Sequence, residues 1–114
     1  MKLIKTDYTV IRVGAEPQGM TVQWPLEPDY DTIRRLVEPV LAAALLERVR
    51  VWHTKQYLDM FVDDQGQLKR LPINDIATMI YRANALQHQQ PTPVAAALPR
   101  IYGPAVLFHR PVWS

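Results

Sequence analysis

The spacing of apolar residues changes several times along this 114-residue chain, and these changes constrain the fold more than any other feature. Apolar and polar residues alternate over 20–24 and again over 48–53, as in strands with one buried face. Over 33–45, between these stretches, apolar residues recur every three or four positions, as on one side of a helix. A chain of this length provides one domain, 1–114, which is therefore predicted to combine strands and helices.

Prolines and turn residues divide the first part of the chain into elements. Strands are predicted over 2–13 and 20–24, joined by a loop over 14–19 into an N-terminal hairpin. Asp29 or Asp31 is expected to cap the helix that follows. The apolar stripe of that helix contains a proline, Pro39, which lacks a backbone N–H and clashes with the preceding turn. We therefore expect a kink or a break at this proline.

The second part of the chain returns to strand patterns around one more helix. Strands are predicted over 48–53 and 57–62, and a brief return strand over 68–71. Asn74 is well placed to cap a second helix that ends near 84–87.

The remaining residues predict a connector and a last strand. The segment 88–100 contains three prolines without periodicity, which indicates an exposed connector, and 101–110 offers a final strand. This order of elements predicts an α+β fold, with an antiparallel sheet of four to five strands and two helices on one face. It is compatible with a split βαβ arrangement extended by the N-terminal hairpin, and other α+β orders stay open.

The composition excludes several kinds of chemistry. The chain has no cysteine, and its one serine is Ser114, which excludes disulfide scaffolds, thiolate nucleophiles and a buried Ser-His-Asp triad. Its histidines, His53, His88 and His109, lack metal-ligand spacing, so we expect neither a metal nor a cofactor. His53 with Asp59 is the best acid–base pair, but neither has a nucleophile beside it. An enzyme is therefore not expected.

The charges are few and nearly balanced. Thirteen Lys and Arg oppose eleven Asp and Glu, and the net charge of +2 creates little field for a nucleic-acid partner. Charged residues at 2, 5 and 7 interrupt any export signal. The longest apolar run, 40–46, is far shorter than the roughly 20 residues that span a bilayer. The expected location is the cytoplasm, without membrane attachment.

One strand face carries the residues best suited to binding. Alternation places Arg48, Arg50 and Trp52 on one face, with Lys55 and Tyr57 just beyond. Guanidinium groups bind phosphates and flat aromatic rings stack on bases, so this face is a candidate nucleic-acid surface. The acidic residue at position 59 lies on the stacking face and opposes that interpretation. A solvated strand face is the competing interpretation.

The C-terminal tail offers a second candidate. Trp113 follows Pro111 near the end of the chain, where it could belong to the core or dock on a partner or a second copy.

Three stretches, 61–74, 77–78 and 101–107, carry a motif of acid-x-Gly-x-Leu, Leu-Pro-x-Asn and Gly-x-Ala-Val. With this motif the chain resembles a domain family of unknown function that is spread through bacteria, phages and other mobile elements. The departure lies at 37–39, where such sequences carry a Val-Gly-Gly turn. The resemblance implies a shared fold and a mobile-element origin, but no reaction.

The motif also has a reading in terms of folding alone. The segment 64–66 makes a turn, Leu68 and Leu71 anchor the return into the core, and Asn74 caps the helix.

Taken together, the residues favour a small, non-catalytic cytoplasmic accessory protein that acts by binding a protein partner or by self-association. The alternative is a nucleic-acid-binding protein that uses the basic and aromatic strand face. A discriminating observation is whether that face is open, covered by the tail or buried between copies.

Overall fold

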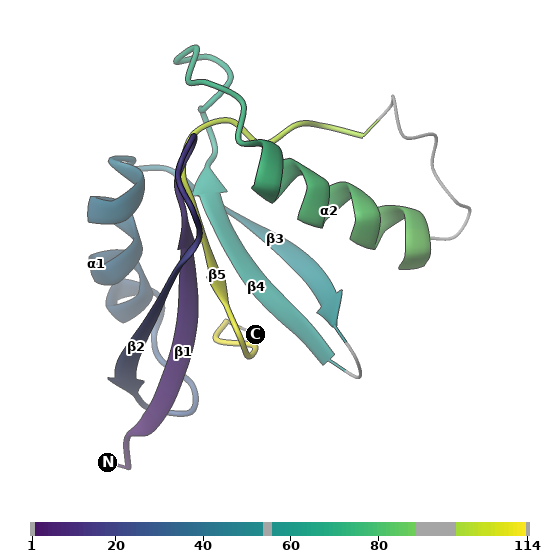
Figure 1. Ribbon diagram of the computed structural model, residues 1–114. Helices are drawn as coiled ribbons and strands as arrows, with labels where there is room; N and C mark the ends of the chain where they lie inside the picture. Colours follow the sequence, from purple (N-terminus) through teal and green to yellow (C-terminus); the bar gives the residue numbers. More distant parts are fainter. Residues whose placement is uncertain (1, 54–55, 89–97, 114) are drawn as a thin grey trace.

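Seven helices and strands make up the fold in the computed structural model, which describes residues 2–53, 56–88 and 98–113 (Figure 1). In chain order they are β1 (Ile4–Ile11), β2 (Gln18–Trp24), α1 (Tyr30–Leu41), β3 (Leu46–His53), β4 (Gln56–Asp63), α2 (Asp75–His88) and β5 (Ala105–Phe108). The strands form one sheet in the order β2-β1-β5-β4-β3, and all neighbouring pairs are antiparallel. The predicted α+β class, the antiparallel sheet and the N-terminal hairpin are confirmed.

The two helices lie on opposite faces of the sheet, which corrects the prediction that both cover one face. α1 packs through Ile33 and Val37 against a cluster that includes Phe61 of β4. α2 packs through Ala77 against a second cluster that includes Met60, the preceding residue of β4. Because successive side chains of a strand point to opposite faces, the helices that meet them are separated by the sheet.

The burial of β4 explains this correction. All side chains from Leu58 to Asp63 are buried, whereas a strand with one solvent-exposed face alternates between buried and exposed residues. The run Leu-Asp-Met-Phe-Val-Asp therefore belongs to a strand that is covered on both sides.

The split βαβ arrangement is not adopted. In that arrangement the two strands joined by a helix run parallel, with another strand between them. Here α2 joins β4 to β5, which are adjacent and antiparallel, with Phe61 opposite Val106. The last strand thus inserts at the centre of the sheet, between β1 and β4.

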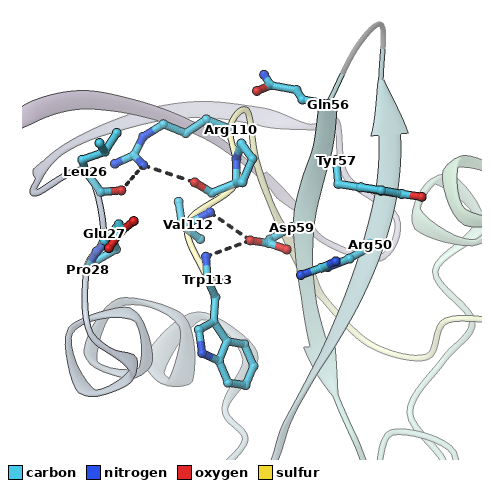
Figure 2. A pocket seen from close by; sticks show the side chains of 11 residues that line it. Leu26, Glu27, Pro28, Arg50, Gln56, Tyr57, Asp59, Arg110, Val112 and Trp113 are labelled. Carbon is cyan, nitrogen blue, oxygen red and sulfur yellow. Dashed lines mark hydrogen bonds between the residues drawn. The ribbon is translucent and has the colours of Figure 1, made fainter.

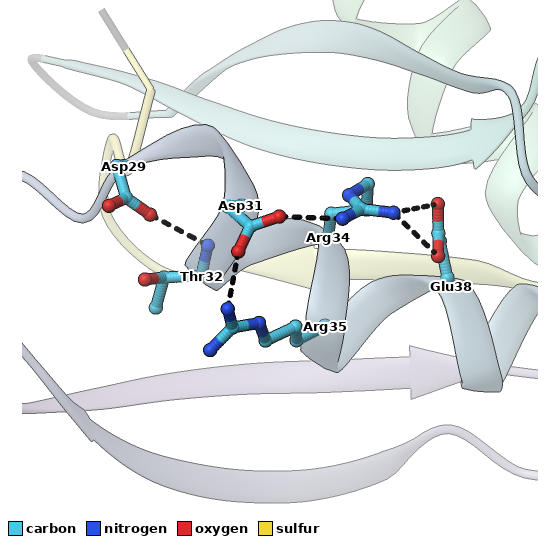
Figure 3. A network of polar contacts seen from close by, with 6 residues as sticks. All are labelled: Asp29, Asp31, Thr32, Arg34, Arg35 and Glu38. Atoms are coloured by element: carbon cyan, nitrogen blue, oxygen red, sulfur yellow. Dashed lines mark hydrogen bonds and ion pairs between the residues drawn. The ribbon is translucent and has the colours of Figure 1, made fainter.

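Polar contacts fix the start of α1 (Figure 3). The Asp29 carboxylate accepts a hydrogen bond of 2.7 Å from the Thr32 backbone N–H, as predicted for the cap. A hydrogen bond with the Thr32 side chain, and next this backbone bond, hold the pKa of Asp29 below its usual range. Asp31 pairs with Arg34 and Arg35 at 2.6 Å each. These exposed pairs lie on the side of α1 that faces solvent and contribute little to stability.

Pro39 lies inside α1, and the helix ends just after it rather than breaking at the proline. α1 ends at Leu41, two residues beyond the proline, and Ala42 takes a left-handed conformation with φ of 52°. The Ala43 N–H then donates to the Glu38 carbonyl and closes the helix end. The apolar stripe therefore does not continue as helix to residue 45.

Asn74 starts α2, as predicted, and ties it to the sheet. Its Oδ1 accepts from the Ala77 N–H at 3.1 Å, and its Nδ2 donates to the carbonyls of Ile11 and Gly103 at 2.8 and 2.9 Å. This fully buried amide therefore satisfies carbonyls in two other segments.

Two smaller expectations have a different outcome. The residues 68–71 form turns rather than a return strand, and Leu68 is 81% exposed instead of anchored in the core. Most of the predicted connector 88–100 lies outside the described residues, and at its described end Leu98 is buried.

Among the described residues, neither helix has the length and apolar character that crossing a membrane requires.

Candidate functional site

The sheet brings part of the predicted binding face together. β3 pairs with β4 so that Arg48 lies opposite Phe61 and Arg50 lies opposite Asp59. These residues share the face that α1 also covers. Tyr57 lies on the same face, and its ring centroid is 5.7 Å from the Arg50 guanidinium carbon. The side chain of Trp52 and the whole of Lys55 lie outside the described residues.

The C-terminal tail, residues 109–113, crosses this face and is held by a buried carboxylate (Figure 2). Asp59 is 1% exposed, and its Oδ2 accepts hydrogen bonds from the backbone N–H groups of Val112 and Trp113 at 2.9 and 3.0 Å. A carboxylate that accepts two backbone donors is a strong local anchor. The face is therefore partly covered by the tail, one of the three arrangements considered from the sequence.

Trp113 packs against its own chain. Its ring lies 5.1 Å from the ring of Tyr30 on α1 and stacks at 6.3 Å on that of Phe61. The Arg48 guanidinium carbon is 4.6 Å above the Trp113 ring, and Arg48 also donates to the Trp113 carbonyl. Trp113 nevertheless stays 37% exposed, so part of its surface remains accessible.

Arg110 holds the start of the tail against β1 and against the segment that follows β2. It donates to Thr6 Oγ1 at 2.8 and 3.1 Å, and to the carbonyls of Pro25 and Leu26 at 3.0 and 2.8 Å. Burial lowers the pKa of this guanidinium from its ordinary value. Its hydrogen bonds hold the segment that follows β2 against the tail.

These contacts leave a hollow of 570 Å³, which we call the tail groove. Figure 2 shows the tail between the segment 26–28 on one side and Arg50 with Tyr57 on the other. The groove is lined by Leu26, Glu27, Pro28, Arg50, Gln56, Tyr57, Asp59, Arg110, Pro111, Val112 and Trp113. Its rim combines exposed apolar and aromatic surface with two exposed charged side chains, Arg50 and Glu27.

The carboxylates of β4 are already bound by their own chain. Asp63 pairs with the Lys69 ammonium at 2.8 Å and accepts from the Gln65 N–H at 2.9 Å. The register places Asp59 opposite Arg50, three positions from His53 along β3, so these two residues are not cross-strand partners. Within residues 2–53, 56–88 and 98–113, no three His, Asp or Glu side chains converge as metal ligands would.

Reasoning from the sequence missed the roles of Asp59 and Arg110. Asp59 was interpreted as an acid that opposes base stacking, whereas it anchors the tail. A signal was available, because an acid between Leu58 and Met60 in an apolar run requires a buried partner. Nothing in the sequence indicated that this partner would be the backbone of residues more than fifty positions away.

Comparison of the chain with models of protein families gave no match, and neither did comparisons with curated proteins and with solved structures. The resemblance to the mobile-element family stays a prediction.

Proposed function

We propose that this chain is a non-catalytic cytoplasmic accessory protein, and that a protein partner docks in the tail groove. The observation that carries the proposal is the gathering of Trp113, Tyr57 and Arg50 around one hollow, each with exposed surface. Trp, Tyr and Arg are the residues most enriched at the energetic centres of protein interfaces. Leu26, which is also exposed, adds apolar surface at the facing rim.

The groove walls are fixed before a partner arrives. Asp59 and Arg110 hold the tail through hydrogen bonds to backbone and side chain, so Trp113 needs little ordering on binding. A preorganised surface loses less conformational entropy in a complex, which supports a binding role.

The exposed charges of the groove, Arg50 on one side of the tail and Glu27 on the other, require a partner that matches both (Figure 2). Arg50 is exposed and lies against the Tyr57 ring, so it offers a cation next to an aromatic surface. The guanidinium of Arg110 is instead occupied by groups of its own chain. We therefore expect a protein segment that places a carboxylate at Arg50 and an apolar side chain against Trp113.

Nucleic-acid binding has less support as a function of the same face. Arg48 lies against Trp113 and donates to its carbonyl, so it is engaged within the chain. A phosphate backbone would have to compete with these contacts.

The test introduces a photo-crosslinking amino acid at position 57, with position 68 as an exposed control on the turn after β4. We expect protein adducts at position 57 that are absent at position 68. The captured protein is then purified, and its affinity is measured for the wild type, Arg50→Ala and Tyr57→Ala.

Each substitution should weaken binding about tenfold or more, which corresponds to about 1.4 kcal/mol. Met79→Ala, on the solvent side of α2, should leave the affinity unchanged. Equal adducts at both positions would contradict the proposal. Nucleic-acid adducts at position 57, with an affinity that falls steeply with salt, would support the alternative function instead.

A further inference from the structure

The two edges of the sheet differ in the way they are protected. β3 forms one edge and carries the charged residues Glu47, Arg48 and Arg50. β2 forms the other edge, and its seven residues, Gln18–Trp24, include no charge and no proline. Natural proteins usually guard exposed edges with charges, prolines or bulges, because unpaired backbone groups there recruit another strand. The β2 edge lacks each of these devices.

β2 is also regular enough to accept a partner strand. It pairs with β1 without interruption from Gln18 opposite Val10 to Trp24 opposite Ile4, so its outer backbone groups follow one straight ladder. Pro17 and Pro25 bound the segment, which limits further pairing to the same seven residues. Figure 1 shows β2 on the outer side of β1.

We propose that β2 pairs with β2 of a second copy, which forms an antiparallel dimer with one continuous sheet. The sequence of β2 fits itself in this arrangement. With Thr21 on the two-fold axis, all seven residues overlap, and Met20 lies opposite Val22 of the second copy. Both side chains are apolar and lie on the face that α1 covers, and Met20 is 40% exposed in the single chain.

The absence of charge favours a second copy over a different partner. A two-fold axis brings the central residue opposite its own equivalent and every other residue opposite one from the same short strand, so an edge with charges of one sign would repel itself. In β2 the central pair is Thr21 with Thr21, and the flanking pairs are uncharged. Two copies of β2 can therefore pair without repulsion between charged side chains of that strand.

The test places like charges on the axis. Thr21 is exposed and donates to the Asp7 carboxylate across β1 at 3.0 Å, so both test variants also carry Asp7→Asn, which leaves the introduced charge without an ion-pair partner on β1. Asp7→Asn/Thr21→Lys puts two ammonium groups opposite each other at the dimer axis. The double variant Asp7→Asn/Thr21→Glu puts two carboxylates there, and it tests the same contact independently if the first variant folds poorly.

Sedimentation velocity over a concentration series measures the dimer. We expect the wild type to dimerise. Each variant alone should have a dimer dissociation constant at least tenfold higher than that of the wild type. An equimolar mixture of the two variants should form a heterodimer. Dimers of Asp7→Asn/Thr21→Lys as tight as those of the wild type, a monomeric wild type, or a mixture no tighter than its components would overturn the proposal. Arg50→Ala should leave the dimer unchanged, because the tail groove does not include β2.

Discussion

Asp59→Ala removes the carboxylate that anchors the C-terminal tail. Its Oδ2 accepts two backbone hydrogen bonds, and hydrogen bonds to a charged group contribute about 1.5–3 kcal/mol each. The released tail can bind water through its own N–H groups. The loss of stability therefore lies at the low end of the summed contribution of the two hydrogen bonds. We expect the free energy of unfolding to fall by about 3 kcal/mol.

Two assays separate loss of the anchor from general destabilisation. Urea unfolding gives the free energy, and carboxypeptidase digestion of the native protein reports whether the tail has left the sheet. Asp63→Ala is the matched control, because Asp63 is buried on the same face of β4 but binds Lys69 and the Gln65 N–H instead. The control should lose stability without faster digestion of the tail.

Two results would contradict a specific anchoring role for Asp59. If Asp59→Ala unfolds within about 0.5 kcal/mol of the wild type, the two hydrogen bonds do not stabilise the fold as the geometry implies. If both variants release the tail at the same rate while fully folded, Asp59 is not a specific anchor.

Three further substitutions test other parts of the fold. Burial, and next a hydrogen bond with Asp64, raise the pKa of Glu47 above its ordinary value of 4.5. The folded state then holds its proton more tightly, and stability falls as pH rises from about 4.5 through the raised pKa. Glu47→Gln should therefore match the wild type near pH 3.5 and exceed it in thermal unfolding near pH 7, and the opposite trend would contradict this sign. Asn74→Ala removes a helix cap and two buried donors and should cost about 3–4 kcal/mol in urea unfolding, whereas a loss under about 1 kcal/mol would argue against a central role. Gly66→Ala places a Cβ 2.7 Å from the Tyr102 carbonyl oxygen and should cost about 2 kcal/mol by the same measurement, with an unchanged midpoint as the contrary result.

Local signals in the sequence predicted the elements well. The cap at Asn74, the helix end after Pro39 and the hairpin before Pro25 each depend on the backbone chemistry of a few neighbouring residues. Such chemistry acts whatever the rest of the chain does, and so it can be interpreted without a structure.

The layers and the site depended on contacts that the sequence does not encode locally. The prediction assumed a sheet with one solvent-exposed face, whereas the burial of every side chain from Leu58 to Asp63 shows that β4 is covered on both faces. The tail reaches Asp59 across more than fifty residues through backbone N–H groups, which every residue except proline possesses. A donor common to all residues leaves no sequence signature.

The two proposed surfaces have a joint consequence. Antiparallel pairing of β2 around Thr21 keeps the sheet continuous, so the two-fold axis is perpendicular to it and the same face of both copies points to the same side. The tail groove opens on the face that α1 covers, and its lining residues come from β3, β4, the tail and the segment 26–28. None of them lies in β2, so both grooves stay open in the dimer. A dimer would then bind a partner with two copies of the recognised segment far more tightly than a single-copy segment. Asp7→Asn/Thr21→Lys should abolish this gain while leaving the affinity for the single segment unchanged. Arg50→Ala should instead weaken binding of both segments, because Arg50 lines the groove itself.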